Sequence, residues 1–161
     1  MSIRSVMQKA ANKIKPAIKR ELKAQGHYLS GNLENSLKDT ILFGENGTKI
    51  EGTALGYAKY LEDGFPAQSA NWGQLPFMIK YFIARGLGAK EAKQAAAATI
   101  MKWMKEGMPT EGSRRFSKTG NRKRFIKIVG KAIDQEIDKI ILEGLDKEID
   151  KTYHKTKSET I

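Results

Sequence analysis

Apolar residues near the start of the chain recur every three to four positions, which is the spacing of one face of a helix. Residues 2–25 are therefore predicted to form an amphipathic helix whose other face carries Lys and Arg. Pro16 lacks a backbone N–H, so we expect a kink or a split at this position, and Gly26 is expected to end the helix. The apolar face consists of Ile3, Val6, Met7, Ala10, Ile14, Ile18 and Leu22.

A second helical pattern begins at Asn121, where apolar residues step by four. The repeat is too short and too often interrupted by glycine to indicate a coiled coil. We expect a core helix bent at Gly130 or Gly144, followed over residues 153–161 by a frayed, flexible tail rich in Lys, Thr and Ser. The apolar positions are Phe125, Val129, Ile133, Ile137, Ile141, Leu145 and Ile149.

A short helix and a β-hairpin are predicted between these two patterns. Ser30 is a suitable cap for a helix over residues 31–37, because its hydroxyl accepts a hydrogen bond from an otherwise unpaired N–H. Residues 40–43 and 48–52 are predicted strands. The Asn46-Gly47 pair between them is typical of a hairpin turn.

Another short helix is predicted after the hairpin. Tyr57, Tyr60 and Leu61 recur at i, i+3 and i+4, so we expect their side chains to form its core-facing side. Gly64 lies where a helix C-terminus favours a left-handed residue. Glu62 is expected in a solvated or subunit-pairing helix end, because a nuclease would need several carboxylates converging on magnesium.

Two further helices are predicted over residues 76–106. Pro76 suits the first turn of a helix, and Gly86 and Gly88 interrupt the pattern that follows. The second helix, over residues 89–106, is the clearest in the chain because its alanine run has high helix propensity. Its apolar face consists of Ala92, Ala96, Ala97, Ile100, Met101 and Met104.

Two large rings, Phe65 and Trp72, lie in a predicted loop over residues 65–73. One interpretation is that both rings fold back onto the core. The other is that they contact a partner, since aromatic anchors concentrate binding energy at interfaces.

These elements favour an α+β fold, with a small antiparallel sheet packed by the N-terminal helix and the long C-terminal helix. We expect one domain over residues 1–152. The helix pair over residues 76–106 is an insertion on this framework, followed by an irregular basic loop over residues 107–120.

The amino-acid composition indicates a folded domain without disulfides or membrane spans. The chain has 161 residues, of which 40% are apolar, which is enough for one domain with a real core. It has no cysteine and hence no disulfide or thiolate chemistry. The N-terminal residues lack the apolar run of a signal peptide, and no window is long and apolar enough to cross a membrane, so we expect no membrane association.

The residue types of common catalytic and metal sites are sparse. The two histidines, His27 and His154, have no metal-ligand spacing to other residues. No Gly-x-Ser-x-Gly elbow is present, and Gly86-Leu87-Gly88 lacks the third glycine of a dinucleotide-binding turn. We therefore expect no enzyme, no cofactor and no metal.

Charge alternates in blocks along the chain. Residues 1–30 carry +6, residues 31–75 carry −3, residues 76–131 carry +11 and residues 132–161 carry −3. Such blocks suit complementary contacts between copies or partners, because charge steers and selects association. They also suit contact with nucleic acid.

The strongest functional pattern is a basic run over residues 114–131 that contains no acidic residue. Its cations could neutralise phosphates, and its aromatic rings could stack on bases. Contact with an acidic protein neighbour and simple solvation are the alternatives, because Phe125 also fits the helix core and only Phe116 is spare. The run consists of Arg114, Arg115, Lys118, Arg122, Lys123, Arg124, Lys127 and Lys131.

The chain resembles the tail-completion or neck proteins of long-tailed bacteriophages, which join head to tail. That family carries a Thr/Ser-Gly-x-Leu-x-x-Ser segment, a hairpin, and then Gly-x-x-x-x-Tyr-Ala-x-x-x-Glu-x-Gly. A weaker similarity extends over residues 75–107, and together these stretches cover under half of the chain. The matching positions are Ser30, Gly31, Leu33, Ser36, Gly52, Tyr57, Ala58, Glu62 and Gly64.

The resemblance implies a structural virion protein, assembled in the host cytoplasm, that forms a ring of six copies between connector and tail tube. Its partners would be connector- or portal-side and tail-side phage proteins, and the Glu62 position would be structural. One alternative is a basic nucleic-acid-binding module that uses residues 114–131. Another is a minor tail or scaffold-type assembly factor outside the neck.

Overall fold

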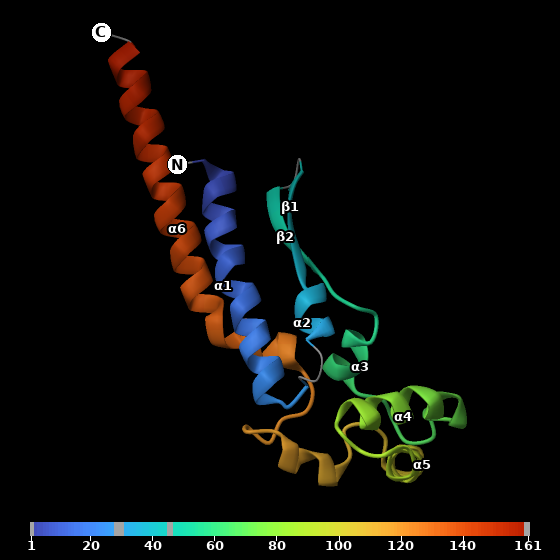
Figure 1. Cartoon of the computed structure of the whole chain (residues 1–161). Helices are drawn as coiled ribbons and strands as arrows, with labels where there is room; N and C mark the ends of the chain where they lie inside the picture. Colours follow the sequence, from blue (N-terminus) through green and yellow to red (C-terminus); the bar gives the residue numbers. More distant parts are fainter. Residues whose placement is uncertain (1, 28–30, 45–46, 160–161) are drawn as a thin grey trace.

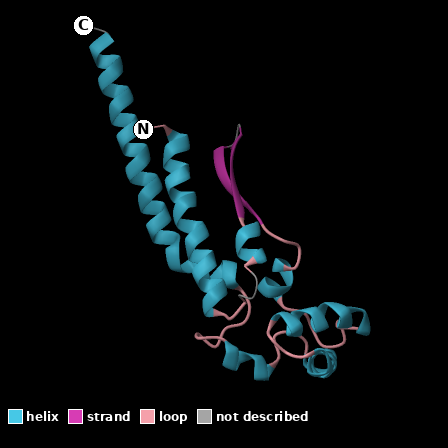
Figure 2. Ribbon diagram, viewed as in Figure 1, coloured by secondary structure: helices cyan, strands magenta, loops and turns pink. Residues whose placement is uncertain are grey.

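The computed structural model describes residues 2–27, 31–44 and 47–159 (Figure 1). Helices dominate the chain, and the two strands form a single hairpin within the described residues (Figure 2). The elements in chain order are α1 (Ile3–Ala24), α2 (Asn32–Ser36), β1 (Lys38–Gly44), β2 (Gly47–Thr53), α3 (Ala58–Asp63), the 3-10 helix η1 (Trp72–Gln74), α4 (Leu75–Ala84), α5 (Ala89–Glu106), the 3-10 helix η2 (Glu111–Phe116) and α6 (Phe125–Glu159).

Helices α1 and α6 lie side by side in opposite directions, and α6 extends past the start of α1 (Figure 1). Val6 packs so closely on Gly144 that a Cβ at this glycine would overlap the valine side chain. Lys13 pairs with Glu136 at 2.8 Å farther along the seam. Gly144 therefore permits close helix contact, and α6 continues through it as one helix.

The hairpin packs on the other side of α1, with Ile41 opposite Ile50 in the antiparallel register. Lys15 lies 3.8 Å from Asp39 and helps to fix β1 on the helix. Phe125, the first residue of α6, is fully buried in the core. These packings confirm the predicted α+β class, with a small sheet packed with the two terminal helices. The core cluster consists of Leu22, Leu33, Leu37, Ala58 and Phe125.

The split predicted at Pro16 is wrong, because α1 is one helix of 22 residues. Buried alanines on both sides of the proline, Ala11 and Ala17, pack the helix against its neighbours. At its end, the His27 N–H donates to the Leu22 carbonyl and the Gly26 N–H to the Lys23 carbonyl. With Gly26 at φ 72°, this is a Schellman motif, so the predicted end is confirmed.

The prediction of a frayed tail from Tyr153 is also wrong, because α6 remains helical to Glu159. Hydroxyl groups in the last turns donate to carbonyls of the preceding turn. One is the bond from Thr156 Oγ1 to the Thr152 carbonyl, at 3.0 Å. The helix begins at Phe125, four residues later than predicted. The predicted cap Ser30 and turn residue Asn46 lie outside the described residues.

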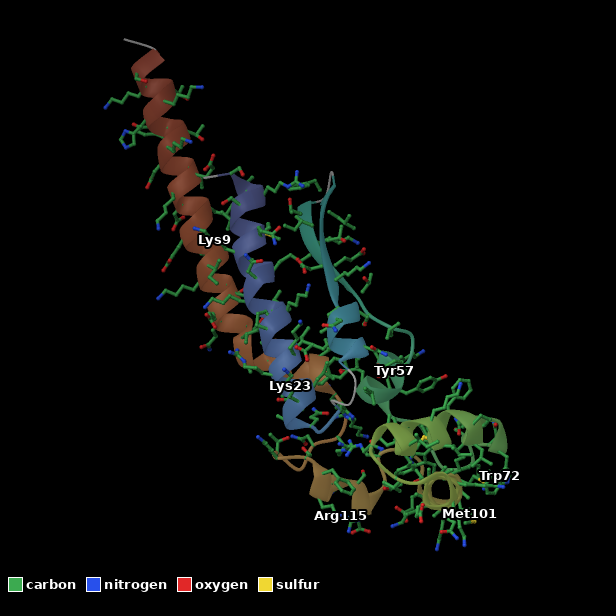
Figure 3. All side chains as sticks on the ribbon, in the orientation of Figure 1. Lys9, Lys23, Tyr57, Trp72, Met101 and Arg115 are labelled. Carbon is green, nitrogen blue, oxygen red and sulfur yellow. The ribbon has the colours of Figure 1, made fainter. Side chains whose placement is uncertain are left out.

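The insertion is a pair of packed helices, α4 and α5, closed at its base by a two-stranded bridge. Phe65 and Met108 exchange backbone hydrogen bonds of 3.0 and 2.8 Å. The Phe65 ring packs edge-on against Trp103 at 5.4 Å, so this ring folds inward. Trp72 instead remains half exposed on the insertion (Figure 3).

Several apolar residues predicted on core-facing helix sides are exposed, including Ile3 of α1 and Ile149 of α6. Tyr57 and Tyr60 of the α3 region are 47% and 55% exposed, and Met101 of α5 is 54% exposed. Helix α3 is only six residues long, so it buries just Ala58 and, in part, Leu61. The i, i+3, i+4 pattern identified the helix correctly but not the face that it buries.

Candidate interaction site on the basic loop

The basic run begins in η2 and crosses a loop to the start of α6. Arg115 lies at the foot of the molecule, away from the hairpin (Figure 3). Its guanidinium carbon is 4.8 Å from the centre of the Phe116 ring, and both side chains are exposed. This cation–π contact presents a charged and an aromatic group to solvent together.

The loop is fixed to the C-terminal end of α1. The Ala24 carbonyl accepts hydrogen bonds from the Lys118 N–H at 2.8 Å and from Ser117 Oγ at 3.3 Å. Gln25, fully buried, donates from Nε2 to the Lys123 carbonyl at 3.2 Å. Helix C-termini leave carbonyls unpaired, and this loop supplies their donors.

Arg122 belongs to this attachment rather than to the exposed surface. Its Nη1 donates to the Gln25 carbonyl. Burial lowers the pKa of Arg122, and the nearby Arg85 adds to this effect while Tyr81 opposes it. The guanidinium therefore connects the loop to the C-terminal end of α1, and its role is structural.

His27 completes the attachment. Its Nε2–H donates to the Arg122 carbonyl at 3.0 Å. Burial, followed by the charge of Arg122, lowers the pKa of His27 from 6.5 to about 4. The imidazole is therefore neutral near pH 7, which suits a structural donor more than a proton carrier.

Glu62 of α3 caps α6 across the chain. Its carboxylate accepts from the Ile126 N–H at 2.8 Å and from the Lys127 N–H at 3.2 Å. Its backbone carbonyl accepts from the Arg124 N–H at 2.8 Å. A helix start has unpaired N–H groups and a partial positive charge, so a carboxylate is favourable there. Glu62 thus fixes the position at which α6 begins.

A second joint connects α2 to α3. Ser36 Oγ donates to the Leu33 carbonyl at 2.7 Å and accepts from the Leu55 N–H at 3.1 Å. Partial burial raises the pKa of Tyr57, and a hydrogen bond from the Leu33 backbone opposes the rise. Residues of the two motif segments are therefore in direct contact.

The remaining basic candidates form an exposed group on η2 and on the loop between η2 and α6. Within the part of the chain that the structure describes, none of them lies within 4.0 Å of a carboxylate. Of the two aromatic candidates, only Trp72 remains available to a partner, and it lies on the insertion. The exposed basic group consists of Arg114, Arg115, Lys118, Lys123 and Arg124.

Sequence reasoning missed the roles of Gln25 and Glu62. Each makes its contacts far along the chain, at separations of 98 residues for Gln25 and 64 for Glu62. A cap inside one helix leaves a local signature, but a cap supplied by another helix does not. Only the position of Glu62 within the family-like segment pointed to a structural role.

The described residues contain no group of three or more His, Asp or Glu side chains that could hold a metal ion. In the same part of the chain, no helix is both long enough and apolar enough to cross a membrane. Comparisons with models of known families, with curated proteins and with solved structures find no match to this chain.

Proposed function

We propose that this protein is a structural virion protein at the head–tail junction of a bacteriophage, where its copies form a ring between connector and tail. One observation carries the proposal: the residues that resemble the neck family converge on one structural joint. Leu33 and Ala58 share the core, Ser36 bridges α2 to the α3 segment, and Glu62 caps α6. The family-like segment thus fixes the positions of both terminal helices.

The mechanism is interface formation. A ring of six copies follows from the family resemblance, and the exposed basic group is its contact with an acidic face of a neighbouring ring. Charge of this kind steers association and selects the partner. The insertion supplies a second contact surface through Trp72 and Phe77, which are 50% and 72% exposed.

The direct test is cryo-electron microscopy of intact particles. We expect density for this chain as a closed ring at the head–tail junction. Infection with a phage that lacks this gene should yield filled heads and free tails that do not join. Complete particles with no copy at the junction would disprove the proposal.

One observation favours a second candidate, a nucleic-acid-binding module. Arg115 and Phe116 offer a cation and a ring side by side, and among the described residues no carboxylate lies within 4.0 Å of the neighbouring exposed cations. Such combinations contact phosphates and stack on bases. Only one exposed ring accompanies the basic group, so we rank this candidate second.

A further inference from the structure

An apolar groove runs along the seam between α1 and α6. Its volume is about 190 Å³, and it is open to solvent on one side. Ile14 and Ile18 of α1 form one wall, and Ile126, Ile133 and Ile137 of α6 form the other. Helical spacing places these three α6 positions on one face, because they are separated by seven and four residues. Nothing in the described chain covers this face.

Gly130 lies in this groove between Ile126 and Ile133. A Cβ at this position would meet no atom within 4 Å. Glycine destabilises the interior of a helix relative to alanine, and no contact among the described residues explains it here. Gly144 of the same helix differs, since Val6 fills the space beside it. A missing side chain at an open groove allows another helix to approach closely.

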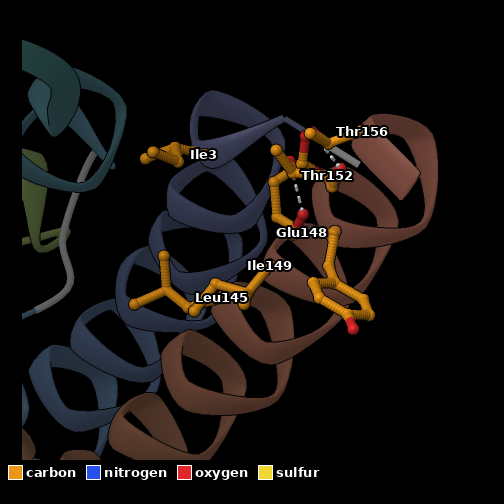
Figure 4. Close-up of a pocket in the computed structure, with 7 residues that line it drawn as sticks. Ile3, Leu145, Glu148, Ile149, Thr152 and Thr156 are labelled. Atoms are coloured by element: carbon orange, nitrogen blue, oxygen red, sulfur yellow. Dashed lines mark hydrogen bonds between the residues drawn. The ribbon is translucent and has the colours of Figure 1, made fainter. Parts of the chain in front are cut away.

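The same helix carries a second apolar stripe that its own chain leaves open. Leu142, Ile149 and Tyr153 are 61%, 65% and 64% exposed. Ile149 lies beside Leu145 at an apolar hollow near Ile3, where α6 passes the start of α1 (Figure 4). Ile149 and Tyr153 therefore lie where α6 passes the start of α1, and Leu142 is exposed beside the stretch that α1 packs against.

The stripe and the groove wall have the same spacing. Leu142, Ile149 and Tyr153 are separated by seven and four residues, as are the three groove isoleucines, and each lies 16 residues after its counterpart. At a rise of 1.5 Å per residue, this offset is about 24 Å along the helix. A parallel helix shifted by that amount would place each stripe residue beside one groove residue.

Charge supports the same alignment. Residues 123–134, around the groove, contain four Lys or Arg and one Asp. Residues 139–150, the matching segment 16 positions later, contain four Asp or Glu and two Lys. The alignment therefore sets a segment of net charge +3 beside one of −2. Both segments belong to one helix, so a second copy of this chain supplies the complementary partner.

We propose that residues 142–153 of one copy lie in the α1–α6 groove of a neighbouring copy, with the two α6 helices parallel and staggered by 16 residues. The contact is heterologous, since groove and stripe are different surfaces, and repeated contacts of this kind close into rings or continue as filaments. The inference rests on the proposed ring and names the contact between its copies.

The test uses two variants of the full chain that each break one side of the contact. Gly130→Trp fills the groove and leaves the stripe intact, whereas Ile149→Lys breaks the stripe and leaves the groove intact. Lys93→Trp, at an exposed position of α5 outside both surfaces, is the matched control. Self-association is measured by sedimentation velocity and native mass spectrometry over a concentration series.

We expect self-association of each groove or stripe variant to be weaker by about tenfold or more, and that of the control to match the wild type. An equimolar mixture of the two variants should form heterodimers and nothing larger, because only one intact groove meets one intact stripe. Circular dichroism verifies folding. If Gly130→Trp does not fold, the exposed Ile149→Lys variant decides alone.

Wild-type self-association that both variants leave unchanged would overturn the inference, as would a wild-type chain that stays monomeric at every concentration. Neither result depends on where the protein lies in a particle. Imaging that finds the chain at the head–tail junction, together with variants that associate normally, would retain the proposed function and reject this contact alone.

Discussion

Single polar side chains determine how the helices of this protein meet. Glu62 is the clearest case, since both of its carboxylate oxygens accept N–H groups at the start of α6. Glu62→Gln keeps the shape but removes the charge that favours a helix start, and its amide can accept only one of the two N–H groups. We expect a loss of about 1 kcal/mol in the free energy of unfolding, measured by urea denaturation. Asp63→Asn is the control, because Asp63 is exposed one residue away, and an equal effect of both changes would contradict this role.

Protonation of His27 should weaken the fold in mild acid. The pKa of His27 is about 4 in the folded protein and 6.5 when unperturbed, so the unfolded chain binds the proton more readily between these values. Stability should therefore fall as pH decreases through this window, by about 1–2 kcal/mol between pH 7 and 5. His27→Gln keeps a donor for the Arg122 carbonyl and does not titrate. A wild-type stability that falls no more steeply than that of this variant would exclude His27 as the cause.

At the scale of elements, Gly64 sets the junction between α3 and the insertion. Its φ is +72°, and a Cβ would overlap the Met108 carbonyl beside it. Gly86 also has a positive φ, +92°, but has open space around it. Gly86→Val should therefore cost only the backbone strain, about 1–2 kcal/mol, and Gly64→Val about 1–3 kcal/mol more. Thermal and urea unfolding measure both; equal losses would show that the bridge at Met108 adjusts freely.

Local sequence patterns predicted where helices and strands lie better than they predicted which side chains those elements bury. The hairpin and the two terminal helices were evident from strand and turn signals and from helical periodicity, which depend on near neighbours. The tyrosine side chains of the α3 region were misplaced, because a pattern of i, i+3 and i+4 does not reveal whether a six-residue helix has anything to pack against. The tail beyond Tyr153 was predicted to fray because of its polar composition. That composition does not show that its hydroxyl groups bond to carbonyls of the preceding helical turn.

At the scale of the whole molecule, the sequence revealed the basic run. It did not reveal that one of its arginines is part of the structure while the others are exposed to solvent. Arg122 is half-buried in the joint between α1 and the loop, through contacts between residues 97 apart in the chain. No local signal separates it from Arg114 or Arg115, which are exposed. Long-range contacts of this kind follow from the fold, so only the fold shows which cations a partner can reach.

Because Arg122 is structural, the function of the basic run can be tested by changing only its exposed residues. Arg114→Ala, Arg115→Ala and Lys118→Ala, combined in one variant, remove exposed charge and spare Arg122. The matched control neutralises three exposed lysines of α5, namely Lys90, Lys93 and Lys105. If the run meets an acidic face of a neighbouring ring, the loop variant should block head–tail joining in an in vitro assembly assay, whereas the α5 variant should not.

Duplex DNA binding by the purified wild-type protein separates the two candidate functions. A protein interface implies weak binding at physiological salt that the loop variant barely changes. A nucleic-acid site implies affinity that falls steeply with salt, with a slope that decreases by about 0.9 for each phosphate contact removed. We expect the first result, because five exposed cations with one exposed ring offer little stacking surface for bases. Submicromolar, strongly salt-dependent binding that the loop variant abolishes would instead assign the basic group to nucleic acid.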